Sequence, residues 1–176
     1  MRATPAAAVA VIPKREVLRW PLLVGLLLLA HSVGAEELAG RVVSIQDGDT
    51  LTVLVSQKQI KVRLTDIDAP ERKQPFSTRS TKSLADLCAG KDARIAEQGK
   101  DRYGRTLGRV FCTSVDANAE QVRRGMAWVS ERYAPRGSPL YAVQAEARAA
   151  KRGLWQDSKP VSPWEWRAAK RGERGG

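Results

Sequence analysis

Three acidic side chains and one arginine lie within 23 residues of this chain, each beside a signal that ends an element of secondary structure. Asp49 follows an Asp-Gly turn, and Arg63 lies in a stretch of alternating apolar and polar residues. Asp68 and Glu71 flank a rigid Ala-Pro corner. Carboxylates that converge repel one another unless a cation or a proton lies between them, and a divalent ion that prefers oxygen ligands fits such a place. The pattern therefore predicts a metal site, although any one of these aspartates, taken alone, is more often a turn residue or a corner cap.

Histidine chemistry is excluded from most of the chain. The single histidine, His31, lies in an N-terminal segment that has the order of a secretory signal peptide, with basic residues, an apolar run over 21–30 and small residues at 33–35. We expect residues 1–35 to be removed on export to the periplasm or the medium, with a later start or an uncleaved anchor as alternatives. The remaining chain would then lack a histidine general base, a serine triad and histidine-bound zinc.

The rest of the chain is basic and of a size for one domain. Residues 36–176 carry a net charge of +8, which favours a polyanionic partner such as nucleic acid. We assign 36–160 to a catalytic domain of OB type and 161–176 to a loose basic tail that contains tryptophan and glycine. We expect a monomer with no stable membrane association once the leader is removed.

The two cysteines suit an oxidising compartment. Cys88 ends a predicted helix and Cys112 ends a predicted strand, and the chain between them reads as a hairpin of 91–97 against 106–111. Antiparallel pairing places the start of the first strand beside the end of the second. The pattern predicts a disulfide, and the alternative is a pair of buried free thiols.

Short strands and a few helices must position these side chains. Alternation and β-branched residues predict strands over 38–46, 50–55 and 59–66, besides the two strands of the hairpin. In the third strand Val62 and Leu64 share one face, so Arg63 should point away from the core. Capping residues and glycine stops predict helices from Ser77 to before Gly90, over 116–124 and over 138–153. We therefore predict an α+β protein, a five-stranded OB-type Greek-key β-barrel with about three helices.

Five fragments together resemble the thermonuclease (staphylococcal nuclease-like) family over nearly all of the chain after the leader. They occur in the order DGDT, VRL, DIDAPE, DRYGR and VRRGMAWV. The resemblance implies hydrolysis of phosphodiester bonds in DNA and RNA to 3′-phosphate ends, with calcium as cofactor. It implies calcium ligands at Asp49, Asp68 and the backbone carbonyl of Ala69.

The resemblance also implies roles for the other residues of these fragments. Glu71 would be the general base or orient the attacking water, and Arg63 and Arg105 would clamp the scissile phosphate. These roles suit the chemistry of a carboxylate and of guanidinium forks. Substrate contacts are implied for Arg102, where a lysine is usual, and for Tyr103 and Tyr133.

The chain departs from the best-known family members in two further places. Only about six residues separate Glu71 from the next helix, where those members have a longer mobile loop. Glu131 takes the position of a second pocket tyrosine, and Tyr133 follows two residues later. Two other classes of function stay open: a catalytically silent OB-type protein that binds nucleic acid, and a basic structural protein of the wall or membrane.

Overall fold

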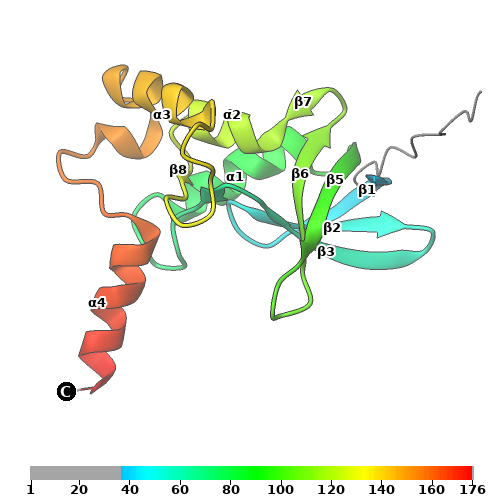
Figure 1. Cartoon of the computed structure of the whole chain (residues 1–176), viewed down its shortest axis with the longest axis horizontal. Helices are drawn as coiled ribbons and strands as arrows, with labels where there is room; N and C mark the ends of the chain where they lie inside the picture. Colours follow the sequence, from blue (N-terminus) through cyan, green and yellow to red (C-terminus); the bar gives the residue numbers. More distant parts are fainter. Residues whose placement is uncertain (1–36, 176) are drawn as a thin grey trace, which may run out of the picture. The chain divides into compact units, whose positions relative to one another are not determined.

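The computed structural model describes residues 37–175, and the predicted signal peptide lies outside this range. The strands are β1 (Glu37–Ile45), β2 (Thr50–Val55), β3 (Lys58–Leu64), β4 (Ile67–Asp68), β5 (Asp92–Lys100), β6 (Thr106–Cys112), β7 (Val115–Asp116) and β8 (Trp128–Val129). The helices are α1 (Ser77–Cys88), α2 (Ala117–Arg123), α3 (Leu140–Ala149), the 3-10 turn η1 (Gly153–Gln156) and α4 (Pro163–Gly175) (Figure 1).

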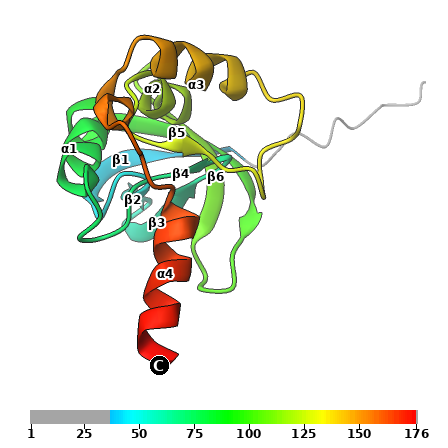
Figure 2. The same ribbon diagram turned by 90° about the vertical axis from the view of Figure 1, so that its left-hand side faces the viewer.

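Five strands form a closed barrel. The order is β3-β2-β1-β5-β6 with antiparallel neighbours, and a parallel pairing of β3 with β6 closes the ring. The short strands β4 and β8 form a separate antiparallel pair beside it. Figure 2 shows the strands of the barrel with helices α1, α2 and α3 around them. The predicted α+β fold with an OB-type barrel is confirmed, with four α-helices among the described residues in place of about three.

Alternation along the strands fills the barrel with aliphatic side chains. Fully buried residues come from every barrel strand and from the inner faces of α1 and α2: Val42, Leu51, Val53, Val62, Leu64, Leu84, Ile95, Val110 and Val122. Burying each such side chain contributes roughly 1.5–3 kcal/mol. The core thereby fixes the strand ends on which the polar residues of interest lie.

The predicted disulfide is confirmed. Cys88 and Cys112 are bonded, with their Cα atoms 5.3 Å apart. Cys112 pairs with Ala93 at the start of β5, as the predicted hairpin requires. The bond ties the end of α1 to the end of β6, and the loop-entropy model gives it about 3.5 kcal/mol.

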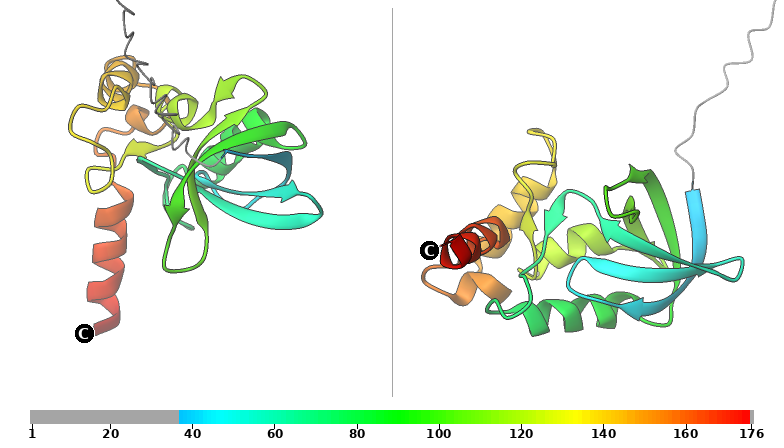
Figure 3. Two further views of the ribbon diagram at one scale, coloured as in Figure 1. Left: turned by 45° about the vertical axis from the view of Figure 1, so that its right-hand side comes forward. Right: turned by 90° about the horizontal axis from the view of Figure 1, so that it is seen from below.

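The C-terminal segment differs from the prediction. Residues 163–175 form helix α4, so the expected loose tail is wrong. The helix begins at a capping box, in which the backbone N–H of Ser162 donates to Glu165 at 2.9 Å and the backbone N–H of Glu165 donates to Ser162 Oγ at 3.3 Å. The Trp164 ring packs against Trp128 with centroids 5.6 Å apart. Figure 3 shows α4 from two further directions.

The other three α-helices form where the sequence predicted them, but some of their boundaries differ from the prediction. Asp116 caps α2 by accepting from the Ala119 N–H at 3.1 Å. Ser77 is the first residue of α1 and not its cap, because the chain enters through Phe76 in the left-handed conformation. Within residues 37–175, none of the helices combines the length and the apolar character that crossing a membrane requires.

Candidate active site

Side chains from two helices, α1 and α2, contact the Asp-Gly turn. The backbone N–H of Asp49 donates to Asp47 Oδ1 at 3.1 Å, and the Gly48 carbonyl accepts from the buried Gln121 amide at 2.6 Å. A Cβ atom at Gly48 would stand 1.8 Å from Ser80 Oγ of α1, so the turn needs glycine for its close approach. These contacts fix where the Asp49 side chain begins.

Asp68 reaches the same place from β4. Its strand pairs with β8, with Asp68 opposite Trp128. The next residue, Ala69, donates its N–H to Asp49 Oδ2 at 2.6 Å, which ties the two acidic segments together. The exposed fractions of Asp49 and Asp68 are 6% and 7%. Two carboxylates predicted from separate strand ends are therefore buried at one site.

Arg63 lies between these carboxylates. Its Nη2 is 3.1 Å from Asp49 Oδ2 and 3.0 Å from Asp68 Oδ1. Its Nη1 donates to the carbonyls of Leu64 at 2.6 Å and Ile67 at 2.9 Å. Arg63 does point away from the barrel core, as the alternation predicted, but its side chain is only 17% exposed. The guanidinium thus supplies the cation that the buried acids require.

Burial dominates the electrostatics of Asp49. Burial raises the pKa of Asp49 to about 7, and the neighbouring Arg63 guanidinium opposes this rise. Two buried carboxylates with hard oxygen donors fit a divalent ion such as calcium. Within residues 37–175 no group of three or more His, Cys, Asp or Glu side chains converges on one point. An ion bound by Asp49 and Asp68 would complete its shell with a backbone carbonyl, water or substrate oxygens.

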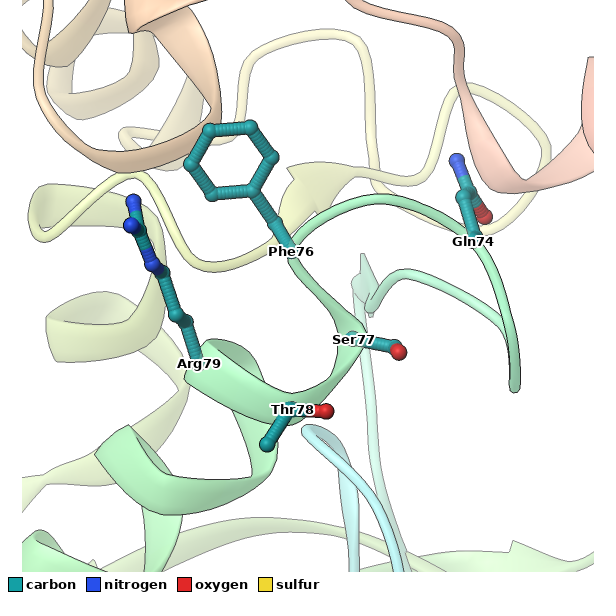
Figure 4. Close-up of a pocket in the computed structure, with 5 residues that line it drawn as sticks. All are labelled: Gln74, Phe76, Ser77, Thr78 and Arg79. Carbon is teal, nitrogen blue, oxygen red and sulfur yellow. The ribbon is translucent and has the colours of Figure 1, made fainter.

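The segment after Glu71 is tied down. The Glu71 N–H donates to Gln74 Oε1 at 2.9 Å, and Gln74 Nε2 donates to the Val161 carbonyl at 2.8 Å. Figure 4 shows the Gln74 side chain directed toward the C-terminal segment. The adjoining pocket, of about 360 Å³, is lined by Gln74, Phe76, Ser77, Thr78 and Arg79 and contains none of the predicted acids. Gln74 therefore positions the Glu71 backbone, a role that the sequence did not reveal.

A second arginine, absent from the predictions, reaches the acids from α4. Arg167 Nη2 lies 2.7 Å from Asp68 Oδ2, and its Nη1 lies 2.5 Å from Glu71 Oε1. Hydrogen bonds to Asp68 raise the pKa of Arg167 further. Because the tail was predicted to be loose, no role was predicted for this residue. The signal for an ordered helix was present in the Ser162, Pro163 and Glu165 pattern, a capping box with proline at the first helical position.

Arg105 belongs to the same face of the barrel as Arg63. Strands β3 and β6 run parallel with Arg63 opposite Leu107, so Arg105, two residues earlier, shares that face. Its Nε donates to Asp101 Oδ2 at 2.7 Å, and its backbone N–H donates to Asp101 Oδ1 at 3.0 Å. The two terminal nitrogens bond to no other residue of the described chain. The fork is oriented by Asp101 with its outer end available.

The predicted substrate contacts fall into two places. Arg102 and Tyr103 lie at the turn between β5 and β6, where Arg102 Nη2 is 2.6 Å from the Tyr103 hydroxyl. Tyr133 follows β8, with the Arg132 guanidinium 5.4 Å from its ring centroid. The two tyrosines are 69% and 70% exposed. Within residues 37–175, no hydrogen bond or ion pair joins any of the three to Asp49 or Asp68.

Comparisons with known proteins give one family and several relatives. The model of the staphylococcal nuclease homologue family matches residues 61–157. An uncharacterized endonuclease of Haemophilus influenzae is 46% identical over 151 residues, which cover 83% of this chain and 84% of that protein. An uncharacterized endonuclease of Escherichia coli O157:H7 is 44% identical over 82% of this chain and 95% of its own. A micrococcal nuclease of Shigella flexneri is 43% identical over 74% of this chain and 80% of its own.

Proposed function

Because this chain belongs to the family of staphylococcal nuclease homologues and is a phosphodiester-hydrolysing nuclease, we propose that it is an exported, calcium-dependent enzyme that cleaves DNA and RNA to 3′-phosphate ends. The observation that supports calcium is the pair of buried aspartates bridged by Arg63 Nη2 at 3.1 and 3.0 Å. The guanidinium compensates part of the negative charge of these carboxylates, and a divalent ion with a preference for oxygen can bind the remaining lone pairs of their oxygens beside it.

Asp49, Asp68 and the Ala69 carbonyl would hold the ion. Bound calcium would supply Lewis-acid stabilisation of charge on the phosphoryl oxygens. The three groups come from the turn before β2 and from the β4 corner, and the hydrogen bond from Ala69 N–H to Asp49 keeps them adjacent.

Glu71 is the residue proposed to activate water. Its side chain is 39% exposed, so water reaches it, and its backbone is fixed through Gln74. The carboxylate takes a proton from the attacking water while the water oxygen bonds to phosphorus. The bond from phosphorus to the 5′ oxygen breaks, the 5′ oxygen leaves with the bonding electron pair and takes a proton from solvent water, and the phosphate remains on the 3′ oxygen. With no histidine after residue 31, a carboxylate is the available base.

The two predicted arginines divide the remaining work. Arg105 is oriented by Asp101 through Nε, so its terminal nitrogens can donate to non-bridging phosphate oxygens. Arg63 is placed on the same face and holds the aspartates, so it orders the site and adds positive charge beside the phosphate. Such preorganised donors stabilise the charge that accumulates in the transition state.

The proposal is tested with purified protein, plasmid DNA and RNA in calcium or in excess chelator. Calcium-dependent degradation is expected, and the DNA ends should not support polymerase extension until a phosphatase removes the 3′-phosphate. Nucleic acid that is retarded on a gel but intact would instead identify a catalytically silent binding protein. Extension without phosphatase would reject the 3′-phosphate product while leaving the nuclease in place.

Export is tested separately. Cell fractionation should find the protein in the periplasm or the medium, with an N-terminus close to residue 36 in the mature form. A full-length cytoplasmic protein would reject export, and would also remove the expectation that the disulfide forms in the cell.

A further inference from the structure

Arg167 of α4 contacts the two acids on which the proposed chemistry depends, although it lies outside the segment matched by the family model. Its Nη2 is 2.7 Å from Asp68 Oδ2, and its Nη1 is 3.4 Å from Asp68 Oδ1 and 2.5 Å from Glu71 Oε1. Arg63 also contacts Asp68 Oδ1. Both oxygens of Asp68 are therefore bonded to guanidinium groups.

These contacts compete directly with a metal ion. Calcium binds carboxylate oxygens at about 2.3–2.6 Å. An ion on Asp68 Oδ2 would stand close to Arg167 Nη2, which is 2.7 Å from the same oxygen, so the two positive charges repel each other. Calcium binding at Asp68 and the contact of Arg167 with Asp68 therefore oppose each other.

The fold keeps the released guanidinium close to the reacting groups. The first turn of α4 is fixed by the Ser162 and Glu165 capping box and by packing of Trp164 on Trp128. The side chain of Arg167 is 40% exposed, so it has an open side from which substrate can reach it. A scissile phosphate beside Glu71 lies within the range of a side chain that already contacts Glu71.

The face of α4 that begins at Arg167 is basic. Lys170 and Arg171 follow at three and four residues, the spacing that puts side chains on one face of a helix. The Lys170 ammonium lies 5.1 Å from the Trp166 ring, and Arg171 is exposed. In Figure 1, α4 and the tip of the β5–β6 hairpin extend toward the same side of the domain, one at the left and one at the centre. Both elements carry basic side chains, since that hairpin carries Arg102 and Arg105.

We propose that α4 is a substrate-binding arm and that Arg167 changes partner during the reaction. It pairs with Asp68 and Glu71 before the metal binds, and with a phosphate of the nucleic acid strand once calcium occupies Asp68. Lys170 and Arg171 bind the neighbouring phosphates of the same strand. This inference rests on the proposed calcium-dependent nuclease function, and it adds a phosphate-binding residue to that site.

The first experiment measures calcium binding to the full chain in the absence of nucleic acid, by calorimetry. Arg167→Gln should bind calcium about tenfold more tightly than the wild type, because a typical coupling between two sites has this size. Arg171→Gln removes the same charge from the same helix without touching the acids, and it should leave the calcium affinity close to that of the wild type. An equal calcium affinity in Arg167→Gln and the wild type would overturn the proposed competition between calcium and Arg167 at Asp68.

The second experiment measures KM and kcat on a short single-stranded oligonucleotide at saturating calcium. Arg167→Gln should raise KM about tenfold, because a charged hydrogen bond to phosphate is lost, and Arg171→Gln should raise it less. Arg167→Lys should recover part of the loss, since it keeps the charge and loses only the fork. An unchanged KM in Arg167→Gln would overturn the proposal that α4 is a substrate-binding arm. A wild-type protein that neither binds calcium nor cleaves would reject the proposed function itself, an outcome distinct from either of these.

Discussion

Replacement of Arg63 by lysine tests how the site is held together. The arginine uses one terminal nitrogen for two carbonyls at 2.6 and 2.9 Å and the other for Asp49 and Asp68 at 3.1 and 3.0 Å. A lysine keeps the charge but has a single nitrogen, which cannot occupy both ends of this fork. If the ammonium stays with the carboxylates, the two carbonyls lose their donor.

The size of the effect follows from these contacts. The lost arginine donor leaves two acceptors in a site that is 17% exposed, and each unmet acceptor costs about 1–3 kcal/mol. We expect Arg63→Lys to lower the free energy of unfolding by about 2–6 kcal/mol, a fall in Tm of roughly 6–18 °C for a domain of this size. Turnover should fall on the order of a hundredfold, about 2.7 kcal/mol of transition-state stabilisation.

The measurements are circular-dichroism melting in chelator and turnover at saturating calcium and substrate, at a temperature where every variant is folded. Arg105→Lys is the matched control. Arg105 bonds to Asp101 in a partly exposed pair, and such pairs contribute at most about 1 kcal/mol. We therefore expect Arg105→Lys to lose turnover to a similar extent with a Tm within about 3 °C of the wild type.

Two results would contradict this account. If Arg63→Lys melted at the wild-type temperature, the fork would not be what joins the two acids to the strand end. If Arg105→Lys kept near-normal turnover, its oriented guanidinium would have no part in the transition state, because a solvated arginine tolerates lysine within about 0.5 kcal/mol.

Three further changes test the metal site, the disulfide and the turn. Asp49→Asn and Asp68→Asn each keep the shape of the side chain and remove its charge, so calcium titration should show weaker binding in a folded protein. Unchanged calcium affinity in both variants would show that these residues are not calcium ligands. Ala at both Cys88 and Cys112 should lower the free energy of unfolding by about 3.5 kcal/mol, measured by urea denaturation, and an unchanged midpoint would show that the bond does not form. Gly48→Ala puts a Cβ atom 1.8 Å from a serine oxygen of α1, so both Tm and calcium affinity should fall. A variant with the Tm and the calcium affinity of the wild type would contradict the close approach of the turn to α1.

The fold was predictable because its signals are local. The strands alternate with period two, and the cysteine pair lies at matching ends of a hairpin, so the barrel and the disulfide follow from short stretches of sequence. The start of α1 was less predictable. Ser77 has the chemistry of a cap, yet the positive φ of Phe76 brings the chain in by another route. Entry angles of this kind depend on packing that no short stretch contains.

The parts of the site that escaped prediction are held by contacts between distant segments. Gln121 reaches Gly48 across 73 residues, Gln74 reaches Val161 across 87, and Arg167 reaches Asp68 across 99. Nothing in the residue types of two glutamines marks them as buried donors. Arg167 was hidden for another reason, since the glycine-rich basic composition of the tail outweighed a capping signal that was present in the sequence.

Closure of the barrel explains how the two predicted arginines come to lie on one face. Arg63 and Arg105 share a face only because β3 and β6 pair in parallel with Leu64 opposite Gly108. A shift by one residue would send the Arg105 side chain to the other face, so this register must be fixed. Gly108 contributes to this register toward both neighbouring strands. Its carbonyl accepts from the Thr65 N–H at 3.0 Å, just after β3. Its lack of a side chain lets β6 lie close to β5, because a Cβ atom at this position would stand 2.5 Å from the Ile95 side chain. The position of Arg105 thus depends on a glycine that touches neither the acids nor the phosphate.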